Sequence, residues 1–338
     1  MADRAEQQVP DRPGAVAHRG RGNGGLMSAL GRRGYTLVEL IIALVLLGIV
    51  SGAIYQVLVN NQRVYQAQTQ QIDLQENLRA ATTVLPAEFR ELDAVDGDIQ
   101  SMTPTSIQIR AMRKLGFLCT APALAVGLGN FTMNVWVSPM YGRNLPFAAG
   151  DSVLVFWGGN AARRDDDQWL PVKITGASPF FTCPDAQPAG GTPGYQLSTS
   201  PPAWMNIPGL AVNGAIPKGA PVRAFSIIKY QLYQSSSDGM WYVGYQNISK
   251  GSSVQPLIGP LTGSDGLELD YFDVNGAVTT DSSQVALIEI HVRAQTAQPV
   301  RSGGALGTLA NKVDSISTRV ALRNNPRCGP GSAPFVKC

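Results

Sequence analysis

The sequence is poor in histidine. It has two histidines in 338 residues, and no nucleophile motif accompanies them. The Gly-Leu-Gly-Asn segment at residues 127–130 lacks the lysine that follows a phosphate-binding glycine loop. Because imidazole is the most frequent general base near neutral pH, this composition argues against an enzyme. The sequence therefore predicts no catalytic residue and no cofactor.

Net charge is also small. The chain has 27 Lys+Arg against 24 Asp+Glu. The basic excess lies in residues 1–34, which contain six arginines and three acidic residues, so residues 35–338 carry 21 charges of each sign. A neutral chain has no general electrostatic footprint for nucleic acid. A local basic patch stays open as an alternative.

The chain has four cysteines and no CxxC spacing: Cys119, Cys183, Cys328 and Cys338. All four follow the longest apolar run, and an even count on one side of such a run fits disulfides in an oxidising compartment. Four cysteines allow three pairings, which the sequence alone does not separate. Proximity favours Cys328–Cys338, and that choice leaves Cys119–Cys183. A zinc site is the weaker alternative.

Residues 35–59 form the one long apolar run, interrupted only by Thr36, Glu39, Ser51 and Gln56. The length suits a helix that spans a membrane, and it exceeds the apolar core of an ordinary secretory signal. Arginines precede the run, which predicts a cytoplasmic N-terminus and an exported remainder. We therefore expect a single-pass membrane protein.

Residues 60–95 continue the helical pattern with one apolar stripe instead of an apolar surface all round. Its members step by three or four positions: Leu74, Leu78, Ala81, Leu85, Phe89 and Leu92. Polar and charged residues occupy the opposite side, and Pro86 lies close to the end of the pattern. This segment is predicted to be an exported amphipathic half of the helix that packs on a folded domain.

Residues 96–338 change to the two-residue period of β-strands. An Asp-Gly pair at 238–239 and an Asn-Gly pair at 275–276 are turn signals. Stretches rich in Gly, Pro and Ser at 184–221 and 295–311 predict long surface loops. The predicted fold class is α+β, with a long N-terminal helix, membrane-spanning in its first half, packed on an antiparallel β-sheet head.

The first 34 residues form a basic leader. Residues 1–26 are rich in Gly, Arg, Ala and Pro and show no apolar periodicity, which predicts disorder. Met27 is an alternative start codon, in which case residues 1–26 are not translated. Residues 27–34 are a short basic run that ends at Gly34.

The strongest functional signal is the segment Gly-Tyr-Thr-Leu-Val-Glu at residues 34–39, directly after two arginines. A carboxylate this close to the start of a membrane helix is costly. Glu39 either stays hydrated at the interface or pairs with a cation. A cut after Gly34 would free the amine of Tyr35, and Glu39 of a neighbouring subunit could pair with it in apolar surroundings. Such a pair would set the axial register between helices.

At these residues the sequence resembles the prepilin family, which includes type IV pilins and the pseudopilins of type II secretion. The family motif is Gly, an aromatic residue or Met, then Thr-Leu-[Ile/Val]-Glu and an apolar run. The resemblance covers about residues 27–60, and Tyr35 departs from the usual Phe or Met. It implies cleavage by prepilin peptidase between Gly34 and Tyr35, N-methylation of Tyr35 and an assembly role for Glu39.

A weaker resemblance extends over the rest of the chain. The block Leu-Asp-Tyr-Phe-Asp-Val-Asn-Gly (269–276), the alternating strand at 285–294 and Val-Ala-Leu-Arg-Asn at 320–324 follow one another as in minor pilins of the PilW type. Pseudopilins of the GspJ type share a similar order. Major pilins are usually much smaller, so a bulky head suits a low-copy subunit at or near a filament tip.

These resemblances imply a minor-pilin-type structural subunit that initiates, primes or caps assembly of a type IV pilus. Its implied partners are prepilin peptidase, other minor and major pilins or pseudopilins, the inner-membrane assembly platform and the lipid bilayer. One alternative is a GspJ-like minor pseudopilin of a type II secretion system. Another is a tip adhesin or a DNA-binding module. The head is expected in the periplasm and, after assembly, on the filament.

Several carboxylates carry weaker signals. The run Arg-Arg-Asp-Asp-Asp at 163–167 lacks the spaced ligands of a calcium loop, so a solvated turn is the expectation. Asp265, Asp270 and Asp273 could gather around a cation, but strand and turn carboxylates are the simpler interpretation. No metal site is predicted.

Two further patterns have structural explanations. His291 alternates onto the polar face of a strand with Glu289 and Arg293, where a solvated or hydrogen-bonded histidine is expected. The aromatic residues of the hairpin around 238–239 could bind a ligand, but we expect them in core packing: Trp241, Tyr242 and Tyr245.

Processing of the leader can be tested directly. A large side chain at residue 34 would crowd the peptidase site, so Gly34→Leu is expected to leave residues 1–34 attached. Mass spectrometry of the wild-type N-terminus should find Tyr35 with a methylated amine. Assembled wild-type protein that still carries its leader would refute the proposed cut.

Overall fold

The computed structural model describes residues 34–124, 131–142, 145–158, 168–184, 191–200, 216–301 and 308–323. The chain divides into two units between Asn60 and Asn61, and each is described by itself. One helix, α1 (Leu37–Phe89), contributes residues to both units.

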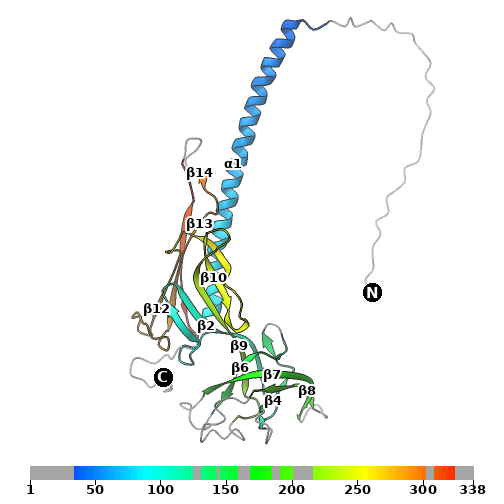
Figure 1. Ribbon diagram of the computed structural model, residues 1–338, viewed down its shortest axis with the longest axis vertical. Helices are drawn as coiled ribbons and strands as arrows, with labels where there is room; N and C mark the ends of the chain where they lie inside the picture. Colours follow the sequence, from blue (N-terminus) through cyan, green and yellow to red (C-terminus); the bar gives the residue numbers. More distant parts are fainter. Residues whose placement is uncertain are drawn as a thin grey trace, which may run out of the picture. The chain divides into compact units, whose positions relative to one another are not determined.

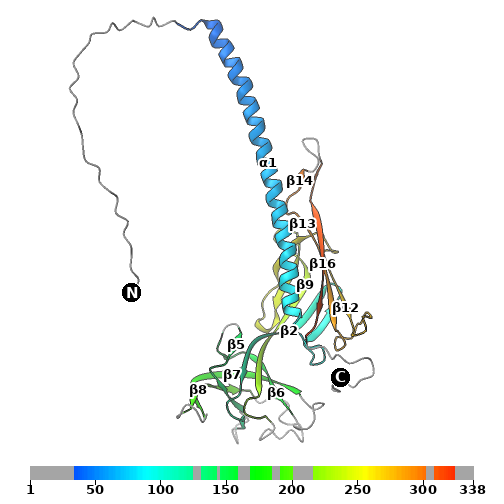
Figure 2. The same cartoon turned by 180° about the vertical axis from the view of Figure 1, so that it is seen from behind.

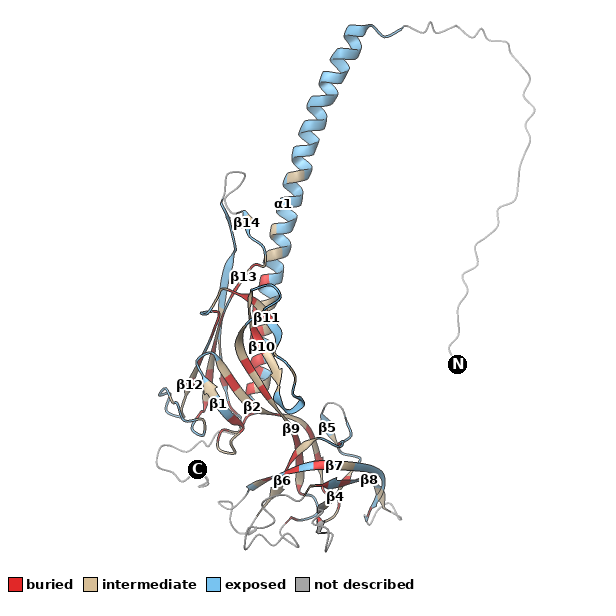
Figure 3. Ribbon diagram, in the orientation of Figure 1, coloured by how far each residue is buried: buried red, intermediate tan, exposed pale blue. Residues whose placement is uncertain are grey.

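The first unit contains the apolar part of α1. Residues 37–58 are mostly Leu, Ile, Val, Ala and Gly, and their side chains are exposed within the chain (Figure 3). A helix satisfies its own backbone hydrogen bonds, which is the requirement for a segment inside lipid. By length and composition, α1 is the one helix among the described residues that could cross a membrane. Its exposed apolar surface fits burial in a bilayer.

The second unit begins with the remainder of α1, which packs on the head. Five side chains of the predicted stripe are at most 5% exposed: Leu74, Leu78, Ala81, Leu85 and Phe89. Phe89 meets the ring of Tyr230 edge-on, with the ring centroids 5.8 Å apart. Buried positions follow one another along this part of α1 in Figure 3. The predicted α+β packing of a long helix on an antiparallel sheet is confirmed.

The head is built from antiparallel strands. They are β1 (Ile99–Thr103), β2 (Ser106–Phe117), β3 (Ala123–Leu124), β4 (Phe131–Trp136), β5 (Tyr141–Gly142), β6 (Ser152–Trp157), β7 (Gln168–Cys183), β8 (Thr192–Thr199), β9 (Pro221–Gln234), β10 (Trp241–Asn247), β11 (Gln255–Leu261), β12 (Leu267–Phe272), β13 (Leu287–Gln295), β14 (Val300–Arg301), β15 (Leu309–Ala310) and β16 (Val313–Ala321). A short 3-10 helix, η2 (Ile248–Lys250), follows β10.

One sheet contains most of these strands. Its main path runs β12-β13-β11-β10-β9-β6-β7-β8-β4-β3. Off this path, β2 pairs with β1, β5 and β9, and β16 pairs with β13. Strands β14 and β15 form a separate two-stranded sheet.

Two apolar cores divide the head into two lobes. In the helix lobe, α1 packs against β1, β2 and β9 to β13. In the disulfide lobe, β4, β6, β7 and β8 enclose the second core. Strand β9 runs through both, because Val222 and Ala224 belong to the second core, whereas Ile228 and Tyr230 belong to the first. Figures 1 and 2 show β9 passing from beside α1 to β6 and β7.

A disulfide in the second lobe joins the segment after β2 to the end of β7. Cys119 and Cys183 are both fully buried, with Cα atoms 5.6 Å apart. Gly194 lies against this bridge, and a Cβ there would come within 2.5 Å of the Cys183 sulfur. This is the pairing put forward from the sequence. Cys328 and Cys338 lie outside the described residues.

The helix ends earlier than predicted. It stops at Phe89, and residues 90–95 form turns and irregular chain instead of continuing the helix. The Asp93 carboxylate accepts the backbone N–H groups of Val95 and Asp96, at 3.1 and 3.2 Å. A side chain that takes backbone hydrogen bonds in this way competes with the helix, so the apolar stripe outlasts the helix by one residue, Leu92.

The predicted loops contain strands. Strand β8 lies within 184–221 and pairs with β4 and β7. Strands β14 and β15 lie within 295–311. Local composition favours turns, but pairing with other strands overrides that preference. The two turn signals are confirmed, with φ of 71° at Gly239 and 79° at Gly276.

The stripe on α1 should dominate the stability of the head. Phe89→Ala removes a fully buried ring and is expected to lower the free energy of unfolding by about 3–5 kcal/mol. Val84→Ala is the control, because Val84 lies on the same helix and is 37% exposed. Denaturant unfolding of the full chain in detergent measures both. Equal losses in the two variants would contradict the packing described.

The disulfide should stabilise its lobe by restricting the unfolded chain. Replacing both cysteines, Cys119→Ala with Cys183→Ala, is expected to lower the free energy of unfolding by about 2–4 kcal/mol. Non-reducing peptide mapping should recover the two residues in one linked peptide pair. A link from Cys119 to Cys328, or free thiols throughout, would contradict the pairing.

Candidate functional site

The candidate processing site lies where the chain enters α1. Residues 34–36 are not helical, and the first helical residue is Leu37. The Thr36 hydroxyl accepts the backbone N–H of Glu39 at 3.3 Å, and the Thr36 carbonyl accepts that of Leu40 at 3.2 Å. Thr36 is therefore the helix N-cap. Thr36 belongs to the motif at residues 34–39, but its capping role was not predicted, although Thr-x-x-Glu is a spacing typical of a helix start.

Nothing within the described chain requires glycine at residue 34. A Cβ built on Gly34 would meet no atom within 4 Å, and Tyr35 is 83% exposed. The peptide bond between them lies in a non-helical, exposed stretch ahead of the helix cap. An enzyme could therefore reach this bond without unwinding α1.

Glu39 lies in the first turn of α1 and is exposed. A carboxylate there interacts favourably with the positive end of the helix dipole. This stabilises the start of the helix within one chain. The same exposed carboxylate is available to a cation on another molecule, so the two roles are compatible.

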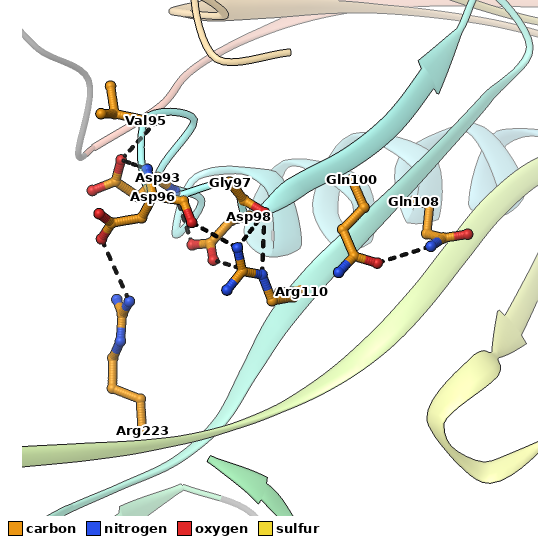
Figure 4. A network of polar contacts seen from close by, with 9 residues as sticks. All are labelled: Asp93, Val95, Asp96, Gly97, Asp98, Gln100, Gln108, Arg110 and Arg223. Carbon is orange, nitrogen blue, oxygen red and sulfur yellow. Dashed lines mark hydrogen bonds and ion pairs between the residues drawn. The ribbon is translucent and has the colours of Figure 1, made fainter. Parts of the chain in front are cut away.

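A polar network follows the other end of α1 (Figure 4). Asp93, Asp96 and Asp98 lie on the loop between α1 and β1. The Asp98 carboxylate accepts the backbone N–H of Asp93 at 3.0 Å. Arg110 of β2 donates to the carbonyl oxygens of Asp96 and Gly97, at 2.6 and 3.1 Å. Its Nε also lies 3.7 Å from the Asp98 carboxylate. Arg110 therefore holds mainly the backbone of the loop.

Arg223 of β9 approaches the same loop. It is 8% exposed. Its guanidinium carbon lies 3.7 Å from the centre of the Trp169 ring, and its Nη2 lies 3.7 Å from Oδ2 of Asp96. Within the described structure, its buried Nε and Nη2 have no hydrogen-bond partner. Burial lowers the pKa of Arg223, whereas the nearby carboxylates raise it.

Burial raises the pKa of all three aspartates. It raises the pKa of Asp96 to about 6, and the charge of Asp93 adds to this rise while Arg223 and Arg110 oppose it. Burial is also the main cause of the raised pKa at Asp93 and Asp98, where backbone hydrogen bonds act in the opposite direction. The sequence could not indicate this network, because Arg223 lies far along the chain from the loop.

Asp265, Asp270 and Asp273 do not converge on one site. Asp265 accepts a hydrogen bond from Arg293 at 2.7 Å, and Asp273 accepts backbone N–H groups of its own turn. Asp270 lies 3.4 Å from the His291 ring. Within the described ranges, no group of three metal-ligating side chains converges. The run at 163–167 and the segment 127–130 lie outside those ranges.

The remaining polar candidate has a structural role. The Nδ1 atom of His291 lies 2.7 Å from the Ser317 hydroxyl, and its Nε2 atom lies 3.7 Å from Glu289. This is the hydrogen-bonded histidine that the strand pattern predicts.

The aromatic hairpin is partly as predicted. Trp241 and Tyr245 pack against the core of the helix lobe. Tyr242 differs, because its hydroxyl donates to the Asp238 carboxylate at 2.7 Å in the hairpin turn. Burial and this hydrogen bond raise the pKa of Tyr242 to about 12. The expectation of core packing is therefore wrong for this residue.

Comparison with known proteins identifies the N-terminal segment. Residues 30–55 match the family described as the prokaryotic N-terminal methylation motif. No curated protein and no solved structure matches the chain. The matched motif covers the non-helical residues 34–36 and the first part of α1. Together with the long apolar helix and the β-rich head, it supports a membrane-anchored, prepilin-like protein of the type IV pilin and pseudopilin kind.

Proposed function

We propose that this chain is a minor-pilin-type structural subunit that initiates, primes or caps assembly of a type IV pilus. The observation that carries the proposal is the methylation motif at residues 30–55, which leads directly into α1. That helix is apolar and exposed in its first part and belongs to the head core in its second. One element thus links a membrane anchor to a folded head.

Prepilin peptidase is the first proposed partner. The bond between Gly34 and Tyr35 precedes the Thr36 cap and lies in non-helical chain. Since no described neighbour occupies the space beside Gly34, a requirement for glycine would come from the enzyme that binds this stretch. Cleavage would leave the Tyr35 amine directly ahead of the helix, where it can be methylated.

Assembly is proposed to use the exposed side chains of α1 between residues 37 and 58. In a bilayer these side chains can contact lipid or the apolar helices of other subunits equally well, so they give little axial register. A charge pair between Glu39 and the Tyr35 amine of a neighbour supplies that register, because an unpaired charge in low dielectric is costly. We infer that Glu39 selects the position of one helix against the next.

The head suits a low-copy position at or near the filament tip. Two lobes with separate cores make it bulky for a close-packed shaft. We propose an inner-membrane precursor with its N-terminus cytoplasmic and its head exported, where an oxidising compartment allows the Cys119–Cys183 bridge. Its further partners would be other minor and major pilins and the inner-membrane assembly platform.

A pseudopilin of the GspJ type has the same processing and the same helix chemistry. The set of subunits that co-purifies with this chain separates the two functions. Pilus subunits support the proposal, and type II secretion subunits support the alternative.

The role of Glu39 yields a test with a matched control. Glu39→Gln keeps the size of the side chain and removes its charge, so the neighbour's amine stays unpaired at a cost of roughly 3–5 kcal/mol. We expect this variant to insert and be cleaved normally but to lose co-purification with other subunits. Glu39→Ala should behave alike. Thr36→Val removes the helix cap and keeps the charge, so it should still co-assemble.

N-terminal mass spectrometry and pull-down of tagged protein from membranes measure both steps. Normal co-assembly of Glu39→Gln would show that the charge does not set register. An equal loss in Thr36→Val would place the effect in the helix start instead of the ion pair.

A further inference from the structure

The two lobes of the head meet where the pairing of two strands is irregular. Strands β2 and β9 are paired through both lobes, and their ladder shifts register between Met112 and Lys114. The opposite β9 residues at this shift are Ala224 and Phe225. Arg223 is therefore next to the crossing, on the side of the disulfide lobe. A β-bulge bends its strand and disrupts the ladder locally, so the backbone hydrogen bonding between these two strands is irregular where the lobes meet.

The loop between α1 and β1 spans this point. Asp96 belongs to the helix-lobe side of the chain, since Leu92 and Ile99 on either side of it are core residues of that lobe. Arg223 belongs to the other side of the junction, because its guanidinium covers the ring of Trp169 on β7 in the disulfide lobe. The Asp96–Arg223 contact thus connects the two lobes.

We propose that the Asp96–Arg223 contact is a proton-controlled latch, which holds the disulfide lobe firmly on the helix lobe when Asp96 is protonated and loosens when Asp96 is ionised. The latch concerns the head alone. It does not depend on the proposed role of the protein in a filament.

The charges at the junction are unbalanced when every group is ionised. Three carboxylates face it from one loop, Asp93, Asp96 and Asp98, whereas β2 contributes only Arg110 and β9 only Arg223. Strand β7 contributes the uncharged ring of Trp169. One proton on a carboxylate brings the half-buried cluster to two charges of each sign.

Asp96 is the carboxylate most able to take that proton. Asp93 and Asp98 each accept at least one backbone hydrogen bond, but within the described structure none is donated to the Asp96 carboxylate. Its distance of 3.7 Å to Arg223 is too long for a hydrogen bond. The Asp96 side chain is 27% exposed, so water and the charges of Arg223 and Arg110 stabilise its ionised form.

The direction of the pH effect follows from linkage. In the docked head, burial raises the pKa of Asp96 from its usual 3.8 to about 6, whereas undocking returns the carboxylate to water. The docked form therefore binds the proton more tightly, and it is favoured as the pH falls through about 6. The gain saturates near pH 4, and its upper limit is a change in the docking equilibrium on the order of 100-fold.

Hydrogen–deuterium exchange of the full chain in detergent tests the latch. After correction for the intrinsic exchange rate, wild-type peptides at 93–98 and 221–227 should gain protection between about pH 8 and about pH 5, by up to about 10-fold. Core peptides such as 153–155 and 288–292 should not change. In Asp96→Asn, the junction should be well protected at both pH values, with most of the pH dependence lost.

Two further variants separate the latch from a general effect of charge. Asp73→Asn, an exposed carboxylate of α1, should behave like the wild type. Arg223→Gln leaves three carboxylates with one guanidinium, so it should loosen the junction near pH 8 and regain protection in acid by a larger factor. Wild-type protection that stays constant or falls on acidification would overturn the proposal. A pH dependence in Asp96→Asn equal to that of the wild type would overturn it as well.

Discussion

The structure depends on one helix whose side chains must suit two different surroundings. Between Leu37 and Leu58, α1 is apolar on all sides, and its side chains are exposed. From Leu74 onward only one stripe is apolar, and the sheet buries it. Because a helix satisfies its own backbone hydrogen bonds in lipid and in protein alike, only the side-chain pattern has to change along it. The larger core of the head is assembled on that stripe, which makes the helix part of the head as well as its proposed anchor.

Carboxylates flank α1 at both ends, and their surroundings give them different chemistry. Glu39 in the first turn is exposed, and an ionised side chain in lipid is stabilised by pairing with a cation, which we propose a neighbouring chain supplies. Asp96, past the last turn, already faces Arg223 at 3.7 Å. Among the described residues none donates a hydrogen bond to its carboxylate, and burial, with the charge of Asp93, raises its pKa to about 6. The first carboxylate therefore suits contact between chains, and the second suits a contact between two lobes of one chain.

Local patterns predicted local structure well and boundaries less well. The stripe from Leu74 to Phe89 and the turn glycines Gly239 and Gly276 are where the sequence indicates them. The predicted continuation of the helix to residue 95 is wrong, because the Asp93 carboxylate takes backbone hydrogen bonds from the following turn. The loop predicted at 184–221 is wrong around β8, because pairing with β4 and β7 outweighs its turn-like composition.

By itself, the sequence determined the features that neighbouring residues encode: the motif at 34–39, the apolar run and the alternation of the strands. These depend on spacing along the chain, which a periodic pattern records directly. Only the tertiary structure decided which distant residues meet. It placed Arg223 over Trp169 and beside Asp96, and it divided the head into two cores that share β9. No local pattern encodes such contacts, because they depend on how strands far apart in sequence pair and twist in space.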